Sequence, residues 1–323
     1  MSSREIHAAA ARILNLAEID WRALETGAGA ADPAAVAGLK LLCGVTQRFS
    51  RAALNAPTAN ESSLFRFDRL EVGDLLGKGT TAEVYRAYDP LLDRHVALKL
   101  RSTTSDMLAH QFIAEGRRLA RIRHPHVVAV HGAAIEGERV GIWMELVPGA
   151  ALEDRIVAGP MPVTDVVDIG MALCSALAAA HACGIVHGDV KPQNVMVESP
   201  GGRIVLTDFG ASCEIDAPAT LVVHGTLSYL APEVIRGALP SPRSDVYSVG
   251  VLLFLALTGK LPYIGNDVDA ISAAHDKGPC NSLRSLRSDL PLDLVAAVES
   301  ALELDRTRRP QTARALATLL VAS

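Results

Sequence analysis

The stretch VHGDVKPQNVMV, residues 186–197, decides how the rest of the sequence is interpreted. Its polar centre offers a carboxylate at Asp189, a cation two residues later at Lys191 and a neutral oxygen ligand at Asn194. A hydroxyl acceptor, a phosphate and a metal ion together require such a set of side chains. Taken one at a time, each of these residues is equally consistent with a surface turn.

The stretch IVLTDFG, residues 204–210, adds a second carboxylate where a strand is expected to end. Asp208 is well placed there to hold a magnesium ion through oxygen, the ligand that this hard cation prefers. As a lone acid it could be an ordinary turn residue. The order and the intervals of all these polar residues together are not expected by chance, so they indicate one shared site.

Two further segments lie upstream, among short alternating stretches. LLGKGTTAEVYRA, residues 75–87, places Gly77 and Gly79 in a turn whose backbone N–H groups can approach a phosphate, although a plain hairpin is the alternative. HVALKL, residues 95–100, places Lys99 within an apolar strand. That lysine either extends from a strand edge into water or needs an anionic partner, and Glu115 in the next predicted helix is available. The alternative for Glu115 is an ordinary surface position.

Composition excludes several classes of protein. The 323 residues are 49% hydrophobic and 21% charged, as in a globular protein, and the net charge of −5 argues against a nucleic-acid binder. The five cysteines are scattered without metal-binding spacing, which indicates reduced thiols. The longest apolar run, VGVLLFLAL at 249–257, is too short to cross a bilayer. These features predict a protein of the cytoplasm without a membrane span.

The texture of the sequence changes along the chain. Residues 1–54 are Ala-rich with apolar residues at helical spacing, which predicts a helical N-terminal region, and residues 55–67 read as a polar linker. Residues 68–146 alternate as strands do, around one helix at 106–123, and residues 147–323 are mainly helical. The sequence therefore predicts an α+β fold with a β-rich part before a larger α-rich part.

The clearest individual elements can be located within these parts. Strands are expected at 69–76, 82–89, 94–100, 127–132 and 139–146. The strongest helical patterns cover residues 166–184 and 244–259.

With these motifs in hand, residues 68–323 resemble the kinase domain of the bacterial Hanks-type, or eukaryotic-like, serine/threonine protein kinases. The resemblance implies a bilobal protein kinase fold, with an N-lobe over 68–146 and a C-lobe over 147–323. It also implies transfer of the γ-phosphate of ATP, with Mg²⁺ or Mn²⁺, to Ser or Thr hydroxyls of protein substrates and of the kinase itself. Lys191 and Thr226 match the serine/threonine pattern of the family.

The resemblance also assigns roles to individual residues. Catalytic roles fall on Asp189, Lys191, Lys99 and Glu115, and metal-binding roles fall on Asn194 and Asp208. Nucleotide-binding roles fall on Leu76, Gly77, Lys78, Gly79, Val84, Ala97, Lys99, Glu145, Val147 and Met196. Scaffold roles fall on an inter-lobe apolar stack, an ion pair and a buried acid: Leu119, Val130, His187 and Phe209; Glu233 with Arg309; and Asp245.

Three residues depart from the pattern of the family. Ala82 replaces the third glycine of the phosphate loop, and Ala151 replaces a polar residue near the ribose. Gly188 stands where many members have an arginine that holds a phosphorylated activation loop. Without that arginine, phosphorylation of the loop at 211–224 is not expected to be obligatory for activity.

Alternative functions stay open at this point. A pseudokinase acting as a scaffold or binding module would fit the fold, although such proteins typically lack at least one of the catalytic residues present here. A small-molecule kinase would share the base and the metal ligands but lack the APE segment at 231–233. Residues 1–64 could contact a regulatory partner or another part of the protein, or could simply cover the kinase surface.

Overall fold

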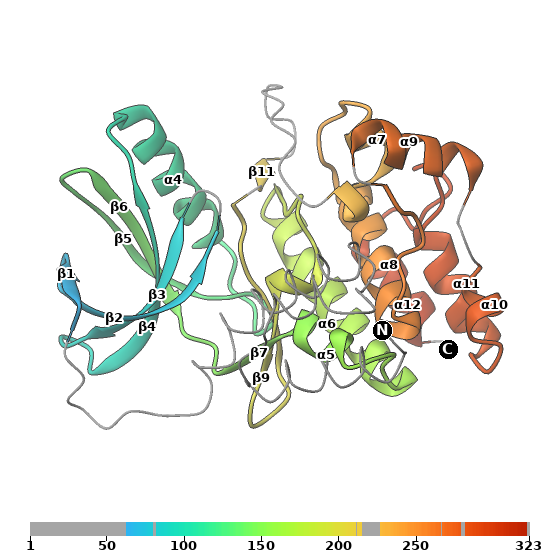
Figure 1. Cartoon of the computed structure of the whole chain (residues 1–323), viewed down its shortest axis with the longest axis horizontal. Helices are drawn as coiled ribbons and strands as arrows, with labels where there is room; N and C mark the ends of the chain where they lie inside the picture. The colour runs from blue at the N-terminus through green and yellow to red at the C-terminus, as the bar shows by residue number, and fades with distance from the viewer. Residues whose placement is uncertain are drawn as a thin grey trace, which may run out of the picture.

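The computed structural model describes residues 63–79, 82–210, 212–214, 227–265, 267–278 and 282–321. The helices expected at 1–54, most of the expected linker and Thr226 lie outside these ranges. The described residues form two lobes, one an antiparallel sheet with a helix and the other larger and mainly helical (Figure 1). This arrangement confirms the expected α+β, bilobal fold.

Six strands form the sheet of the N-lobe, in the order β1-β2-β3-β4-β6-β5, and neighbouring strands run antiparallel. Their bounds are Phe65–Phe67 for β1, Leu70–Lys78 for β2, Glu83–Asp89 for β3, Arg94–Ser102 for β4, Val130–Glu136 for β5 and Arg139–Glu145 for β6. Strand β1 includes the end of the expected linker 55–67, because Phe67 is fully buried in the core of the sheet with Leu70 and Val72.

Helix α4 (Asp106–Leu119) packs across β5 and β6 through Phe112, which lies in one apolar cluster with Val140 and Ile142 (Figure 1). The helix ends four residues before the expected end at 123. Residue Ile122 is buried in the core of the other lobe, and Pro125 disfavours helical backbone just before it.

The segment after α4 also departs from the expectation. The strand expected at 127–132 begins only at Val130, because the residues before it bind the C-lobe. Val128 donates its N–H to the Leu206 carbonyl at 3.1 Å, and Val127 forms a parallel bridge with Leu206. This segment therefore joins the two lobes instead of extending the N-lobe sheet.

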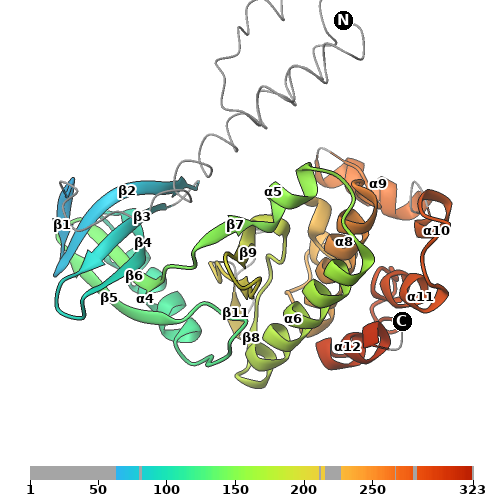
Figure 2. The ribbon, with the colours of Figure 1, turned by 90° about the horizontal axis from the view of Figure 1, so that it is seen from below.

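Eight α-helices, two short 3-10 helices (Pro192–Asn194 and Leu227–Tyr229) and five short strands make up the described C-lobe. The helices are α5 (Leu152–Val157), α6 (Val163–Ala182), α7 (Pro232–Ile235), α8 (Pro242–Thr258), α9 (Val268–Lys277), α10 (Leu283–Leu286), α11 (Leu292–Ala301) and α12 (Ala313–Val321). The strands are β7 (Gly149–Ala151), β8 (Ile185–Val186), β9 (Val195–Glu198), β10 (Ile204–Leu206) and β11 (Cys213–Glu214). They pair as a β10-β9-β7 sheet and a β11-β8 ribbon, which lie on the side of the N-lobe (Figure 2).

Helix α8 begins and ends where its sequence dictates. The Ser241 side chain accepts from the Ser244 N–H, and the Ser244 side chain accepts in return from the Ser241 N–H, a reciprocal cap at the N-terminus. Gly259 ends the helix with φ of 69°, a left-handed backbone that glycine adopts without strain. These two signals explain why α8 matches the helical pattern expected at 244–259 within two residues.

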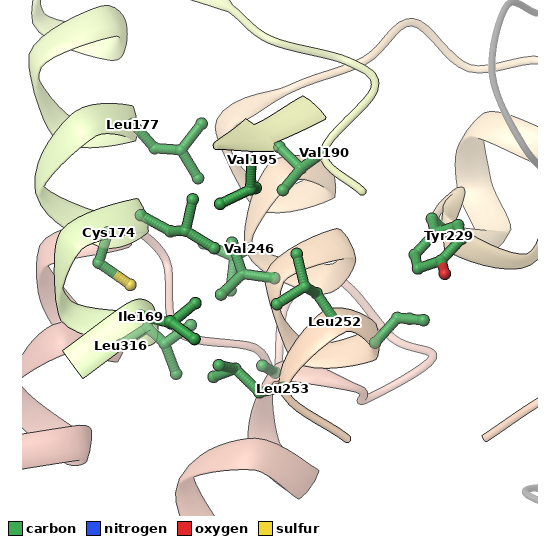
Figure 3. Packing of buried hydrophobic residues seen from close by; sticks show 14 of the residues in the cluster. Ile169, Cys174, Leu177, Val190, Val195, Tyr229, Val246, Leu252, Leu253 and Leu316 are labelled. Carbon is green, nitrogen blue, oxygen red and sulfur yellow. The ribbon is translucent and has the colours of Figure 1, made fainter. Parts of the chain in front are cut away.

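The C-lobe core forms where α6, α8 and α12 meet (Figure 3). Ile169 from α6 lies near Leu253 from α8 and Leu316 from α12, and all three are buried. Leu177, two turns further along α6, is also buried and points toward Val195. Small residues allow the helices to approach closely. A Cβ at Gly170 in α6 would lie 2.8 Å from Leu320 in α12, so a larger residue there would push these helices apart.

Helix α6 is the one helix in the described residues that has the length and apolar composition to cross a membrane. Half of the apolar window is buried inside the protein, and the helix packs against α8, α12 and β10. Buried contacts on this scale are those of the central helix of a folded lobe, which must be apolar around much of its circumference.

A buried ion pair fastens α7 to the C-terminal part of the lobe. The Arg309 guanidinium, which is fully buried, contacts Glu233 with both terminal nitrogens at 2.7 and 2.8 Å. It also donates to the carbonyls of Glu303 and Leu304 at 2.6 and 3.1 Å and lies over the Tyr247 ring. The pairing expected from the sequence is therefore present, with the remaining donors satisfied.

Replacing Arg309 with alanine should lower the free energy of unfolding by about 3–5 kcal/mol, because Glu233 would stay largely buried without a partner. Denaturant unfolding followed by circular dichroism measures this change. Arg308 gives a matched control, since its side chain is 69% exposed and its nearest carboxylate, on Glu303, is 3.5 Å away. Its replacement by alanine should cost less than about 1 kcal/mol, and equal effects of the two substitutions would contradict the assigned importance of the buried pair.

Candidate active site

The loop at 187–194 is anchored by apolar residues on either side of its polar centre. Val190 and Val195 are fully buried and point into the C-lobe core, close to Val246 of α8 (Figure 3). The alternation of buried valines with polar residues leaves Asp189 and Lys191 only partly exposed, at 13% and 17% of their side chains. The sequence of the loop thus determines which of its side chains enter the core and which stay outside it.

Asp245 in α8 holds the start of this loop by its backbone. Its carboxylate accepts from the N–H groups of His187 and Gly188, both at 2.9 Å, and contacts His181 Nε2 at 2.8 Å. Burial works to raise the pKa of Asp245, but the hydrogen bond and charge of His181, the charge of His187 and the Gly188 N–H outweigh it, so the pKa is lowered. The buried carboxylate is therefore ionised and fully hydrogen-bonded.

Asp189, Lys191 and Asn194 come together as one cluster. Asp189 Oδ2 accepts from Lys191 Nζ at 2.7 Å and from Asn194 Nδ2 at 3.1 Å. Asn194 Nδ2 also donates to the Asp189 carbonyl at 2.8 Å. The other carboxylate oxygen, Oδ1, accepts no hydrogen bond within the described residues. The cluster therefore fixes the orientation of the carboxylate and leaves one oxygen for an incoming group.

Lys99 joins the lobes through two carboxylates. Its Nζ lies 2.7 Å from Glu115 Oε1 in α4 and 2.8 Å from Asp208 Oδ1 in the C-lobe. Burial favours the neutral amine, but the charges of Asp208 and Glu115 outweigh it and raise the pKa of Lys99. Lys99 is thus held as a cation, and the strand position predicted for it is confirmed, with Glu115 as its partner.

Asp208 is presented by an uncommon backbone conformation. Its φ of 55° is left-handed, a region that few residues other than glycine adopt. Desolvation by the surrounding protein favours the neutral acid and would raise the pKa of Asp208. The charge and hydrogen bond of Lys99 and the hydrogen bond from the Gly210 N–H outweigh this effect, so the pKa is lowered. The side chain stays 48% exposed, so the carboxylate faces the space between the lobes as an anion.

The apolar stack expected between the lobes is assembled. The rings of His187 and Phe209 lie 4.4 Å apart between centroids, and both side chains are buried. Leu119 and Phe209 belong to one buried cluster, and Val130 packs against it. His187 Nε2 donates to the Thr207 carbonyl at 3.0 Å, which ties the 187–194 loop to the strand before Asp208.

Most of the nucleotide-binding residues expected from the sequence lie in the neighbouring strands β2, β3, β4 and β6 or directly after them, and Met196 lies in β9. Register explains part of this arrangement, because Gly77 pairs with Val84 and Val84 with Lys99 on adjacent strands. Val147, which follows β6, is buried, and its N–H and C=O make no hydrogen bond within the described residues. An unpaired peptide edge in a buried position is suited to the hydrogen-bonding edge of a purine.

The glycine-containing turn is closed by its own contacts. The Gly79 N–H donates to the Ala82 carbonyl at 2.8 Å, and Lys78 pairs with Glu83 at 2.8 Å. Lys78 is 62% exposed and directed to this local partner. The hairpin alternative is therefore correct as local structure, and it remains compatible with backbone contacts to phosphate.

The residues expected to hold a metal fit magnesium in type. The described residues contain no cluster of three or more His, Cys, Asp or Glu that could hold a metal ion alone. Magnesium commonly takes one or two protein oxygens and completes its shell with substrate phosphates and water. The half-exposed Asp208 carboxylate and the Asn194 side chain supply oxygen donors of that kind.

Two arginines near the site make contacts that were not expected from the sequence. Arg203 pairs with Glu145 and Glu198, and Arg118 in α4 donates to the Ser212 carbonyl at 3.3 Å. Neither arginine belongs to a motif, and the first pair joins residues 58 positions apart in the chain. Charge complementarity alone does not identify such partners, since other acids are equally available in the sequence.

Comparisons with known proteins agree with this geometry. The protein kinase domain family matches residues 70–320. The serine/threonine-protein kinase PknL of Mycobacterium tuberculosis is 39% identical over 209 residues, covering 62% of this chain and 52% of the relative. PknB of Mycobacterium leprae is 36% identical over 260 residues, which cover 76% of this chain and 41% of the relative. PrkC of Bacillus subtilis is 31% identical over 254 residues, which cover 76% of this chain and 39% of the relative.

The chain therefore matches about half or less of the length of these relatives, all of which carry the name serine/threonine-protein kinase. The match to the family covers most of the chain and includes every residue of the cluster around Asp189 and Lys99. The chain belongs to the protein kinase domain family, in its bacterial, Hanks-type serine/threonine branch.

Proposed function

We propose that this chain is an active serine/threonine protein kinase that transfers the γ-phosphate of ATP to hydroxyls of protein substrates and of itself. The observation that carries the proposal is the joint assembly of two clusters. One is Lys99 with Glu115 and Asp208, and the other is Asp189 with Lys191 and Asn194. A scaffold protein has no need to keep both clusters intact across two lobes.

Asp189 is the residue that would orient the substrate hydroxyl and accept its proton. Its Oδ2 is occupied by Lys191 and Asn194, so Oδ1 is the oxygen that an incoming hydroxyl can reach. Lys191 would then lie beside the transferred phosphoryl group, where its charge offsets the negative charge that develops there. This arrangement supports phosphoryl transfer by positioning and charge.

Lys99 would contact the α- and β-phosphates while Glu115 keeps it in place. Asp208 and Asn194 would hold magnesium. When bound, Mg²⁺ neutralises charge on the β- and γ-phosphate oxygens. The adenine would lie among Leu76, Val84, Ala97 and Met196 and use the free peptide edge of Val147, next to Glu145.

We place the kinase in the cytoplasm, where ATP is available and thiols stay reduced. Cys174 and Cys183 are free in the structure, and burial raises the pKa of the Cys174 thiol to about 12, which makes it unreactive.

A small-molecule kinase is the alternative for the acceptor. Turnover with a metabolite and none with a protein would favour it.

The Asp189→Ala variant should lose phosphoryl transfer by about a hundredfold or more, because it removes the carboxylate that orients the hydroxyl. Incorporation of labelled phosphate into a generic protein and into the kinase itself measures the loss. Asp168→Ala is the matched control, since Asp168 is an exposed acid in the second turn of α6, and it should keep full activity. If wild type and Asp189→Ala were equally silent with Mg²⁺ and with Mn²⁺ while still folded, the scaffold alternative would be favoured.

We further propose that phosphorylation of the loop at 211–224 is not required for activity. Gly188 offers no side chain to bind a phosphate, and its φ of 76° would be strained for an arginine. The start of the loop is held by other means. Strand β11 pairs with β8, and Arg118 donates to the Ser212 carbonyl. These contacts support an ordered start of the loop without a phosphate.

A Ser212→Ala, Thr220→Ala double variant treated with phosphatase should keep turnover within about tenfold of untreated wild type, since there is no arginine clamp for a phosphate to engage. Initial rates measure this, and mass spectrometry of the treated protein verifies that it carries no phosphate. Ser212 is 8% exposed, so its hydroxyl is shielded from a phosphate donor in this conformation. A loss of about a hundredfold or more would sink the proposal.

A further inference from the structure

Arg203 connects three separate segments at the back of the junction between the lobes. It precedes β10, and its Nε and Nη2 lie 3.0 and 3.2 Å from the two carboxylate oxygens of Glu198 in β9. Its Nη2 also donates to Glu145 Oε1 at the end of β6, and its Nη1 donates to the Pro125 carbonyl at 3.2 Å. One guanidinium therefore contacts the β9–β10 hairpin, the last strand of the N-lobe and the loop after α4.

The loop after α4 and strand β10 are already fastened to each other. His126 Nδ1 lies 2.7 Å from the Ile204 carbonyl, and the Leu206 N–H donates to the His126 carbonyl at 2.9 Å. On the other side of the hairpin, the Ser199 N–H donates to the Pro148 carbonyl at 2.8 Å. Arg203 adds a contact with Glu145 to this junction. The segment 145–148, which connects the lobes, is therefore held at one end through Glu145 and at the other through Pro148.

The charges make Arg203 the centre of this contact. Its side chain and those of Glu145 and Glu198 are only 24–29% exposed, so the pairs are less screened than surface ion pairs. The hydrogen bonds that Arg203 donates to Glu198 and Glu145 raise the pKa of Arg203, which stays protonated. Without the guanidinium, two carboxylates would share this space and repel each other. Removal of Arg203 would therefore break the ion pair with Glu145 and would also leave Glu145 repelled by Glu198.

The same segments bear the proposed nucleotide contacts. Glu145 and Val147 carry the peptide edge assigned to the adenine, and Met196 lies two residues before Glu198 on strand β9. Residues two apart on a strand project to the same face, so Met196 and Glu198 move together with that strand. The position of the adenine edge relative to its apolar floor thus depends on how Glu145 is held relative to β9.

We propose that Arg203 is a positioning residue for nucleotide binding, which fixes the backbone at 145–147 against strand β9. The inference rests on the proposed kinase function, because it takes ATP or ADP as the ligand of the space between the lobes. Lys99, Glu115 and Asp208 are already paired while the Arg203 contacts are made. The arginine therefore supports the assembled site and does not oppose it.

The test measures the affinity for ADP by titration calorimetry, together with KM for ATP and kcat. Arg203→Ala should weaken ADP binding and raise KM about tenfold, with a smaller change in kcat, because the group acts on binding geometry and touches no reacting atom. Arg203→Lys should be intermediate, since an ammonium cannot reproduce the planar fork. Arg155→Ala is the matched control, an exposed arginine of α5, and it should leave all three values unchanged.

A double variant tests whether the effect passes through the hinge carboxylate. Glu145→Gln should weaken ADP binding by itself, and Arg203→Ala combined with Glu145→Gln should be no weaker than Arg203→Ala alone. Strictly additive effects would overturn the inference. Should Arg203→Ala fail to fold in a thermal unfolding assay, Arg203→Lys and Glu145→Gln carry the same comparison.

The remaining outcomes separate this inference from the function on which it rests. Wild type that binds neither ADP nor ATP would overturn both. Wild type that binds ADP and variants that bind it equally well would overturn the role of Arg203 alone and leave the kinase function standing. An increase in kcat with unchanged ADP affinity would also overturn it, since Arg203 would then restrain the motion of the lobes.

Discussion

The ion pair between Lys99 and Asp208 is the constraint on which the rest of the site depends, because it exists only when both lobes and their connection are correctly placed. The two residues lie 109 positions apart in the chain and come from different lobes. Glu115 adds helix α4 to the same contact. The sheet register that positions Lys99 and the left-handed backbone at Asp208 both serve this one junction.

Asp245 is a second buried charge that positions part of the site. Lys99 holds two side chains in place, and Asp245 holds the backbone of the 187–194 loop. Asp245 lies in the middle of the C-lobe core and binds the N–H groups at the start of the 187–194 loop. Burying a carboxylate is costly unless its oxygens are paired. The cost is offset here because α8 presents the acid where His181 and two peptide groups converge. The polar network thus selects one loop conformation among those that the apolar core would permit.

The sequence predicted what depends on residue type and local spacing. The motif intervals identified Asp189, Lys99, Glu115 and Asp208, and the structure places these residues in two clusters of paired side chains. Alternation identified strands β2 to β4, and the helical pattern at 244–259 identified helix α8. It did not predict the early end of α4 or the late start of β5, since Ile122 and Val128 bind the other lobe. Arg203 was missed for a similar reason, because two of its three partners, Pro125 and Glu145, lie far from it in the sequence.

Gly188 shows how a missing side chain can be consistent with an assembled site. Its N–H is one of the two that bind Asp245, and its backbone has φ of 76°. A residue with a Cβ would hold that conformation only under strain, whereas glycine adopts it freely. Glycine at this position therefore lets the backbone that binds Asp245 adopt its conformation without strain. The segment after Asp208 is held at its start by the β8–β11 pairing and by the Arg118 bond to the Ser212 carbonyl.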